Sequence, residues 1–314
     1  MSARPVVSAI VPVYNGAPWL ASTIDSALAQ TFEDLEIIVV NDGSTDDSLA
    51  VATRCLARAG GRLRIIDQAN AGVSAARNAA LQAARGDYFA LLDADDCWLP
   101  DHLATAMAAF DRDPDLGLVH ANIEFIDTHG NSTGVARRCW SRQADAYEAI
   151  ALRHEHVSCP TAVFSRAALE TVGAFDSTFT GFGCEDRDLW LRIAERFRIH
   201  YLDRVSARYR VHPEGMSRQV DPMAMARAML VAKVACSERG RGLVARMQAM
   251  IESDLGLTCL EEDRTGQALR HHWRALRLDP SEPIIRRRIL GALVAIVRKM
   301  PRRLLTLTEQ EAAR

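Results

Sequence analysis

The stretch of sequence that decides the fold is GDYFALLDADD, residues 86–96. Its apolar centre predicts a β-strand at 88–92 that is buried on both faces. Three acidic residues, Asp93, Asp95 and Asp96, follow directly. Ligands of open parallel sheets bind beyond the carboxyl ends of the strands, and hard oxygen ligands suit Mg²⁺ or Mn²⁺, which bridge phosphates. Taken alone, the acids are better explained as a turn that caps the next helix.

The same alternation of apolar runs and polar ends extends through the first half of the chain. Further strands are predicted at residues 6–13, 35–40, 63–66 and 116–121. Between them, helical spacing or alanine-rich runs predict helices at 19–28, from 45 or 46 onward, at 72–84 and at 100–110. This β-α-β-α order implies an α/β fold with a mostly parallel, Rossmann-like sheet and helices on both faces.

The second half of the chain is less regular. Residues 122–142 show a weak, loop-rich pattern, whereas helices are predicted at 165–172 and 185–195 and β structure at 198–211. After Asp221 the pattern is helical throughout. We therefore expect a first domain at 1–220, with halves at about 1–120 and 121–220, and an all-helical C-terminal extension at 221–314. Residues 266–280 are similar to the second half of a tetratricopeptide repeat, and the lack of a second copy favours a helical hairpin over a solenoid.

Composition excludes several classes of protein. The 314 residues carry a formal net charge of -2, and only 6% are aromatic, so neither a coat for nucleic acid nor a stacking platform for single strands is expected. The seven cysteines include no CxxC spacing, which argues against a disulfide scaffold and a structural zinc and favours a reduced, cytoplasmic compartment. No apolar stretch approaches the length of about 20 residues that crosses a bilayer, and the first strand leaves no room for a signal peptide.

A basic segment near the C-terminus has two interpretations. Residues 284–305 carry seven Lys or Arg residues and no acid, and their apolar residues could form one face of a helix. One interpretation is a solvated helix with a basic face. The other is an interfacial helix on anionic lipid, which would place the protein peripherally at the inner face of the membrane.

Four motifs occur in order along the first half: VSAIVPVYN (7–15), IIVVNDGSTD (37–46), NAGVSAARN (70–78) and GDYFALLDADD (86–96). As a set they strongly resemble family 2 glycosyltransferases of the GT-A fold, over roughly residues 6–215. The resemblance implies inverting transfer of a sugar from a nucleotide-diphosphate sugar, typically a UDP-sugar, with Mn²⁺ or Mg²⁺ as cofactor. The implied acceptor is a hydroxyl on a sugar or lipid-linked molecule, in cell-surface polysaccharide or glycolipid assembly.

The resemblance also implies roles for individual residues. Those expected to line the nucleotide pocket are Pro12, Val13, Tyr14 and Asn15, and those expected to border the ribose and diphosphate are Asn70, Gly72, Arg77 and Asn78. Asp42 would accept a hydrogen bond from the base. Asp95 would bind the metal, with Asp96 as its alternative or partner, and which of Asp93, Asp95 and Asp96 contacts metal and which contacts ribose stays open.

Two motifs of the second half complete the resemblance. FGCEDRDLWLR (182–192) matches the family's Glu-Asp segment, in which Asp186 would be the catalytic base and Glu185 would orient it or bind the acceptor. The alternative is that these acids only stabilise a helix N-terminus. YRVHPEGMS (209–217) matches the motif that closes the domain, and its His212 would reach the metal or the diphosphate.

Other functions fit the sequence less well. A membrane-bound processive enzyme would carry QxxRW, whereas residues 267–271 read QALRH, so we expect addition of one sugar at a time. A nucleotidyltransferase would show a Gly-rich basic loop after the first strand, and a dinucleotide oxidoreductase would show GxGxxG there; neither is present. The alternative from another class is an inactive nucleotide-sugar-binding module whose helical tail recruits a partner.

Overall fold

The computed structural model describes residues 5–138, 145–152, 156–179, 183–213, 215 and 220–299. The chain divides into two compact units, Met1–Met229 and Leu230–Arg314. The division falls within helix α8 (Val220–Ala235).

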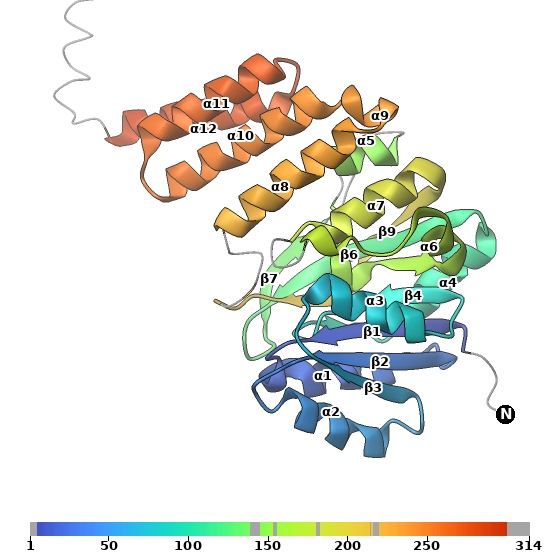
Figure 1. Ribbon diagram of the computed structural model, residues 1–314. Helices are drawn as coiled ribbons and strands as arrows, with labels where there is room; N and C mark the ends of the chain where they lie inside the picture. Colours follow the sequence, from blue (N-terminus) through green and yellow to red (C-terminus); the bar gives the residue numbers. More distant parts are fainter. Residues whose placement is uncertain are drawn as a thin grey trace, which may run out of the picture. The chain divides into compact units, whose positions relative to one another are not determined.

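A parallel block of four strands opens the first unit. These strands are β1 (Val7–Val13), β2 (Leu35–Asp42), β3 (Leu63–Gln68) and β4 (Tyr88–Leu91). They lie in the order β3-β2-β1-β4 with all neighbours parallel (Figure 1). Every residue of β1 and β2 is buried, as their mostly apolar sequences predict, and the buried Ser8 hydroxyl donates to Glu36 across the two strands. Since the strands are parallel, the loops that follow them gather at one edge of the sheet.

The rest of the sheet is mixed, so the parallel character that we expected belongs to the first four strands. β8 (Val163–Ser165) runs antiparallel to both β4 and β6 (Leu116–Ile126), and β6 runs parallel to β9 (Arg198–Arg210). β5 (Cys97–Trp98) and β7 (Ser132–Arg137) add antiparallel pairs with β9 and β6. Strands β6 and β7 occupy much of residues 122–138, so the loop predicted at 122–142 was wrong there; residues 139–142 lie outside the described part.

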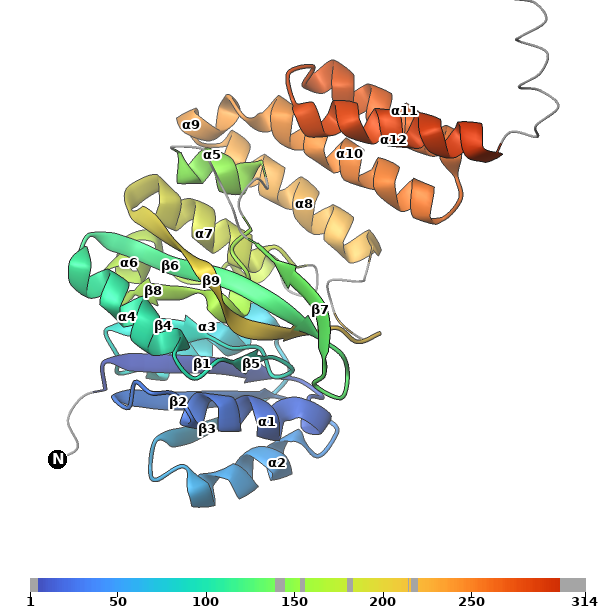
Figure 2. The same ribbon diagram turned by 180° about the vertical axis from the view of Figure 1, so that it is seen from behind.

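Helices cover both faces of the sheet. One face packs Val7, Ala9, Val11 and Val13 against α1 (Ala17–Leu28), α2 (Ser48–Cys55) and α4 (His102–Arg112) (Figure 2). The short helix η1 (Leu56–Arg58) follows α2 and buries none of its residues. Alternate residues of a strand point to opposite faces. The opposite face carries α3 (Val73–Ala83), α6 (Arg166–Val172) and α7 (Glu185–Arg196), with the Phe164 and Trp190 rings 5.7 Å apart. Three short helices complete the unit: α5 (Ala146–Ala151), η2 (Cys159–Thr161) and η3 (Ser177–Phe179).

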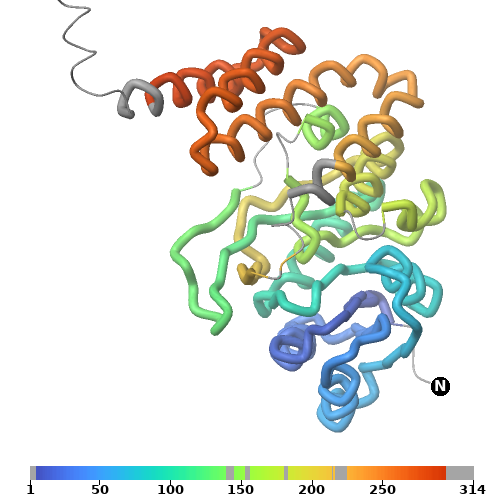
Figure 3. The backbone as a smooth tube through the Cα atoms, turned by 60° about the vertical axis from the view of Figure 1, so that its left-hand side comes forward, coloured from blue at the N-terminus to red at the C-terminus, as the bar shows by residue number. Residues whose placement is uncertain are grey.

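The second unit is helical, as predicted for the C-terminal extension. After α9 (Glu238–Arg241), it consists of α10 (Val244–Glu261), α11 (Thr265–Leu278) and α12 (Pro283–Lys299), which fold back along one another (Figure 3). Ala249, Ala275, Ile285 and Ile289 form its core. Gly256 lets α10 approach α11 closely, because a Cβ there would lie 2.5 Å from the His272 ring. None of the helices in the described part of the chain combines the length and apolarity needed to cross a membrane.

Candidate active site

The loops after β1 and β2 are joined to each other at the edge of the sheet. The backbone N–H of Asn15 donates to Ser44 Oγ over 3.1 Å, and Asn15 Oδ1 accepts from the Thr45 backbone N–H over 2.8 Å. Asn15 takes a left-handed conformation with φ of 52°, which Asn tolerates better than most residues. Of the four residues predicted to line a nucleotide pocket, Pro12 and Val13 are buried within β1, Tyr14 is 56% exposed, and Asn15 holds this junction.

Asp42, at the end of β2, holds the loop between β3 and α3. Its Oδ1 accepts from Gln68 Nε2 at 2.7 Å and from the Ala71 backbone N–H at 3.0 Å, and its Oδ2 accepts from the Gly72 backbone N–H at 2.8 Å. Asn70 Nδ2 donates to the Asp42 carbonyl oxygen over 2.9 Å. Gly72 has a φ of 88°, which suits glycine. The structure thus places Asp42, Asn70 and Gly72 together; their contacts with a nucleotide stay predictions.

The three acids after β4 point to different partners. Asp93 Oδ1 lies 2.8 Å from Arg77 Nη2, and Asp95 Oδ2 lies 2.9 Å from His212 Nε2. Asp96 is buried, and its Oδ1 accepts from the Arg210 backbone N–H over 2.8 Å. Burial and the neighbouring carboxylates raise the pKa of Asp96 well above its usual value. Asp93 and Asp95 remain partly exposed, so they are the two that a ligand can reach directly.

An aromatic ring holds His212 in place beside Asp95. The ring centroids of Trp19 and His212 lie 4.4 Å apart, and the Arg210 guanidinium carbon lies 5.9 Å from the Trp19 ring centroid on α1. Trp19 Nε1 donates to the Thr128 carbonyl over 3.2 Å. Sequence reasoning missed Trp19 and Arg210, although Arg210 ends β9 two residues before His212, within the motif at 209–217.

The pair Asp95 and His212 fits a divalent cation. Carboxylate and imidazole are both ligands that Mn²⁺ accepts, and Mg²⁺ is commonly bound through one or two carboxylates plus the phosphates of a substrate. His212 Nδ1 and Asp96 Oδ2 are buried without a hydrogen-bond partner among the described residues. Both atoms can therefore still form a polar contact with a bound group. Among the described residues, no three His, Cys, Asp or Glu side chains converge on one cation position.

Arg77 on α3 links the two halves of the site. Its Nη1 lies 2.6 Å from Glu185 Oε1, and its Nη2 lies 2.8 Å from Asp93 Oδ1. The same Nη2 lies 3.2 Å from Cys159 Sγ, and burial raises the pKa of that thiol well above its usual value, so it stays neutral. Arg77 is buried, which rules out the solvated helix position. Its predicted contact with ribose and diphosphate stays a prediction, and its charged partners in the structure are the carboxylates of Asp93 and Glu185.

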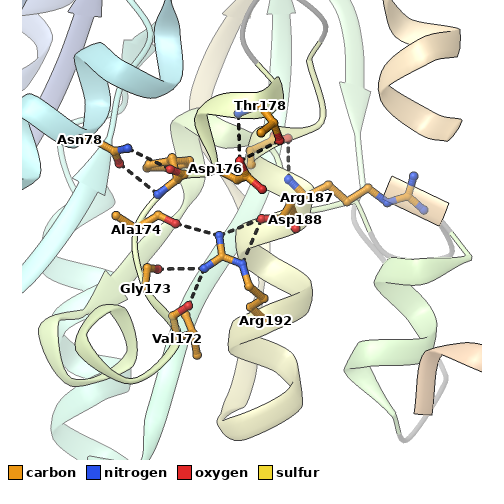
Figure 4. Close-up of polar contacts among 11 residues, drawn as sticks. Asn78, Val172, Gly173, Ala174, Asp176, Thr178, Arg187, Asp188 and Arg192 are labelled. Carbon is orange, nitrogen blue, oxygen red and sulfur yellow. Dashed lines mark hydrogen bonds and ion pairs between the residues drawn. The ribbon is translucent and has the colours of Figure 1, made fainter. Parts of the chain in front are cut away.

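Asn78 faces away from Asp93, towards the turn after α6. Its Nδ2 donates to the Phe175 carbonyl over 2.8 Å, and its Oδ1 accepts from the Phe175 backbone N–H over 3.0 Å (Figure 4). Both ends of the amide are therefore paired with backbone. Its predicted contact with the nucleotide likewise stays a prediction.

The first turn of α7 carries the predicted base. Cys184 precedes it with a left-handed φ of 66°, and the acids of the turn lie at the helix N-terminus, where the helix dipole favours negative charge. Asp186 Oδ1 accepts from the Arg187 backbone N–H over 2.6 Å. Burial and the charge of Glu185 raise the pKa of Asp186 to about 7. A carboxylate with a pKa near the working pH is suited to general-base catalysis.

The comparison with protein families shows which family the chain belongs to. Residues 8–173, more than half of the chain, match the model of glycosyl transferase family 2. The chain belongs to glycosyl transferase family 2. A family 2 chain of this kind is expected to carry the four motifs of the first half, and the predicted resemblance is confirmed.

Relatives of this family 2 chain match about two thirds of its length. It is 30% identical to the chondroitin synthase of Escherichia coli over 215 residues, which are 68% of this chain and 30% of that protein. It is 29% identical to an uncharacterized glycosyltransferase of Rickettsia prowazekii over 211 residues, which are 66% of this chain and 64% of the relative. The chain thus spans less than two thirds of the length of these curated relatives.

Two solved structures share the fold. S. aureus TarS 1–349 in complex with UDP-GlcNAc has a TM-score of 0.64 and 19% identity, and the match covers 91% of this chain and 88% of that one. The mannosyltransferase PcManGT from Pyrobaculum calidifontis, in complex with GDP-Man and Mn²⁺, has a TM-score of 0.62 and 22% identity and covers 99% of this chain and 81% of that one. The predicted GT-A fold is confirmed by this likeness.

Proposed function

We propose that this family 2 chain transfers one sugar at a time from a UDP-sugar to an acceptor hydroxyl, with inversion at the anomeric carbon and with Mn²⁺ or Mg²⁺ as cofactor. The observation that carries the proposal is Arg77, which ion-pairs with Asp93 beside the predicted cation site and with Glu185 beside the predicted base. It brings donor-side and acceptor-side carboxylates to one edge of the sheet. We place this activity in residues 1–220, in agreement with the motifs.

On the donor side, Asp95 and His212 would hold the cation, which would offset the charge that develops on the departing diphosphate. Asp93 pairs with Arg77 over 2.8 Å and is 28% exposed, so it can accept hydrogen bonds from donor hydroxyls. Asn15 and Asp42 fix the two loops between which a nucleotide would bind. The nucleotide-sugar complexes of the two neighbours, one with UDP-GlcNAc and one with GDP-Man, support a nucleotide-diphosphate sugar as donor.

On the acceptor side, Asp186 takes the proton of the acceptor hydroxyl while that oxygen bonds to the anomeric carbon. The bond from the same carbon to the diphosphate oxygen breaks, and the diphosphate leaves with the bonding electron pair. Attack from the face opposite the leaving group inverts the centre, and a single base is enough for this step. Glu185 pairs with Arg77, and its charge raises the pKa of Asp186, which favours protonation of Asp186 once the hydroxyl is in place.

The face of α12 supports a second proposal, peripheral binding to an anionic membrane. Leu290, Leu293 and Val294 are 63%, 44% and 43% exposed, and the exposed Arg287 lies one turn before them, while Ile285 and Ile289 face the core of the second unit. An apolar face beside arginines fits anionic lipid. Arg288 is not part of this face, because its Nη1 lies 3.0 Å from Asp254 Oδ1. Residues 300–305 of the predicted basic segment lie outside the described part.

The function is tested by incubating the full chain with a panel of nucleotide sugars and Mn²⁺, and by measuring both binding and release of the nucleoside diphosphate. The proposal expects release from at least one UDP-sugar by the wild type. The Asp186→Asn variant is expected to bind the same donor and to release nothing. Binding by both proteins without release by either would favour the inactive binding module.

A further inference from the structure

The turn at 173–175, which follows α6, contacts two helices of the site. One is α3, which carries Arg77, and the other is α7, which carries Asp186. Asn78 pairs with both backbone groups of Phe175, over 2.8 and 3.0 Å (Figure 4). The Arg77 guanidinium carbon lies 5.3 Å from the centre of the Phe175 ring. The turn is therefore tied to α3 by two adjacent residues of that helix.

Arg192 ties the same turn to α7. Its Nη1 donates to the Val172 and Gly173 carbonyls over 2.7 and 2.9 Å, and its Nη2 donates to the Ala174 carbonyl over 2.9 Å. These are carbonyls at the C-terminal end of α6 and in the turn, which have no partner within a helix. Figure 4 shows the guanidinium directed at all three. One side chain thus fixes the path of the backbone from α6 to Phe175.

The other edge of that guanidinium is bound by the first turn of α7. Nε and Nη2 of Arg192 lie 3.0 and 2.8 Å from Asp188 Oδ2, and the Asp188 side chain is 4% exposed. Asp188 stands two residues after Asp186 in the same turn. On the other side of the helix, Arg187 Nε donates to the Ile150 carbonyl of α5 over 3.0 Å. The orientation of the turn that presents Asp186 is therefore set by contacts on both sides.

We infer that Arg192 is a positioning residue for Asp186: through Asp188 and the turn at 173–175 it fixes the first turn of α7 against α3. The inference rests on the proposed function. Arg192 touches neither Asp186 nor Glu185 in the structure, and it acts on them through the backbone that they share with Asp188. Only a planar, forked group with several donors can bond the carboxylate and three carbonyls together, so lysine does not replace it.

The test compares Arg192→Lys with Arg196→Lys in the full chain. Arg196 lies one turn further along α7 and is exposed, so the control makes the same substitution in the same helix. We expect kcat of Arg192→Lys to fall by about 10–100-fold, because a displacement of the order of 1 Å in a reacting group has an effect of that size. The affinity for UDP with Mn²⁺ and the KM for the donor should stay unchanged. The Arg196→Lys variant should match the wild type in all of these.

A merely structural role would give a different result. It would lower the melting temperature and the yield of folded protein, while kcat per folded molecule and the pH dependence of kcat would stay those of the wild type. We expect instead that the ascending limb of the pH profile moves, because the surroundings of Asp186 change. A wild-type kcat and pH profile in folded Arg192→Lys, or a loss of UDP affinity in step with kcat, would overturn the inference. Asp188→Asn, which keeps the shape of the side chain, provides a second variant if Arg192→Lys does not fold.

Two further measurements separate this inference from the proposed function. If the wild type releases no nucleoside diphosphate from any donor, the proposed function fails. The positioning role of Arg192 is then tested alone by hydrogen exchange of the backbone amides of residues 186–189. Exchange should accelerate in Arg192→Lys and not in Arg196→Lys. Unchanged exchange in Arg192→Lys would contradict the inference. In an active enzyme, the effects of Arg192→Lys and Asn78→Ala on kcat should be non-additive, since both act through one turn.

Discussion

Arg77 and Glu185 form a buried ion pair, with 2.6 Å between Nη1 and Oε1 and with side chains 4% and 7% exposed. Arg77 lies on α3, and Glu185 opens α7, so the pair joins elements from the two halves of the fold. The second nitrogen of the same guanidinium holds Asp93. Asp93 and Glu185, which we propose to lie on the donor and acceptor sides, therefore share one arginine.

Removing the Arg77 guanidinium should destabilise the protein strongly. We expect Arg77→Met to lower the free energy of unfolding by about 3–5 kcal/mol, because it leaves a buried carboxylate without its partner. Urea unfolding followed by circular dichroism measures this change. Adding Glu185→Gln to the variant should restore part of the stability. An Arg77→Met protein as stable as the wild type would show that the pair is dispensable to the fold.

Loss of Asp95 should abolish binding of UDP that depends on Mn²⁺. Asp95→Ala removes a carboxylate that lies 2.9 Å from His212 Nε2. Of the two proposed ligands, only His212 would then be left to hold the cation. Calorimetric titration with UDP, with and without Mn²⁺, measures the effect. Asp115→Asn, at a side chain that is 89% exposed, is the control and should bind as the wild type does. Unchanged Mn²⁺-dependent binding by Asp95→Ala would exclude Asp95 as a ligand of the cation.

The rate of transfer should depend on pH through Asp186. Its pKa is raised to about 7, and only the ionised form can accept the proton of an acceptor hydroxyl. We therefore expect kcat to rise as the pH increases through about 7 and to level off above it. Steady-state rates from pH 5 to about 9 show this directly. A profile that is flat across that range would argue against Asp186 as the base.

The same raised pKa predicts the stability of Asp186→Asn. Folding favours the protonated carboxyl, so the wild type loses stability as the pH rises from the ordinary value of 3.8 to about 7. The neutral amide does not ionise. The variant should therefore match the wild type near pH 4 and exceed its melting temperature near pH 8. Equal melting temperatures at both pH values would mean that Asp186 ionises without a folding cost.

Binding to anionic vesicles should depend on the exposed face of α12. The double variant Arg287→Glu and Leu290→Ser is expected to pellet less with vesicles that contain phosphatidylserine, because it reverses a charge and removes an apolar contact. Arg277→Glu makes the same charge change at an exposed position of α11 and should pellet as the wild type does. Deletion of the whole helix is a poorer test, because Ile285 and Ile289 belong to the core of the unit. If the wild type does not pellet, the membrane proposal is abandoned.

Sequence patterns identified the parts of the fold whose signal is local. β1 and β2 are mostly apolar, and their positions were predicted closely. β5 and β8, with two and three residues, are too short for any periodicity. The outer half of β6 was missed because its partner is distant: Phe125 pairs with Tyr209 across a large separation in sequence. Strand pairing of that kind cannot be read from a window along the chain.

The candidate site shows the same division. The motifs identified Asp93, Asp95, Asp186 and His212 as residue types with suitable chemistry. They did not distinguish Asp95, which faces His212, from Asp96, which is buried against the Arg210 backbone, because adjacent residues diverge only in three dimensions. The ion pairs of Arg77 were likewise invisible, since nothing local marks an arginine as buried.

The shared arginine also constrains how the gene can change. A mutation that deletes Glu185 alone leaves the buried Arg77 with Asp93 as its one remaining carboxylate, and a mutation that deletes Arg77 alone leaves a buried carboxylate without its partner. Each single mutation therefore lowers the stability of the folded protein, whatever its effect on catalysis. Evolution of an inactive homologue would therefore have to begin at another residue. Asp186 is an example, because loss of its charge is expected to stabilise the folded protein.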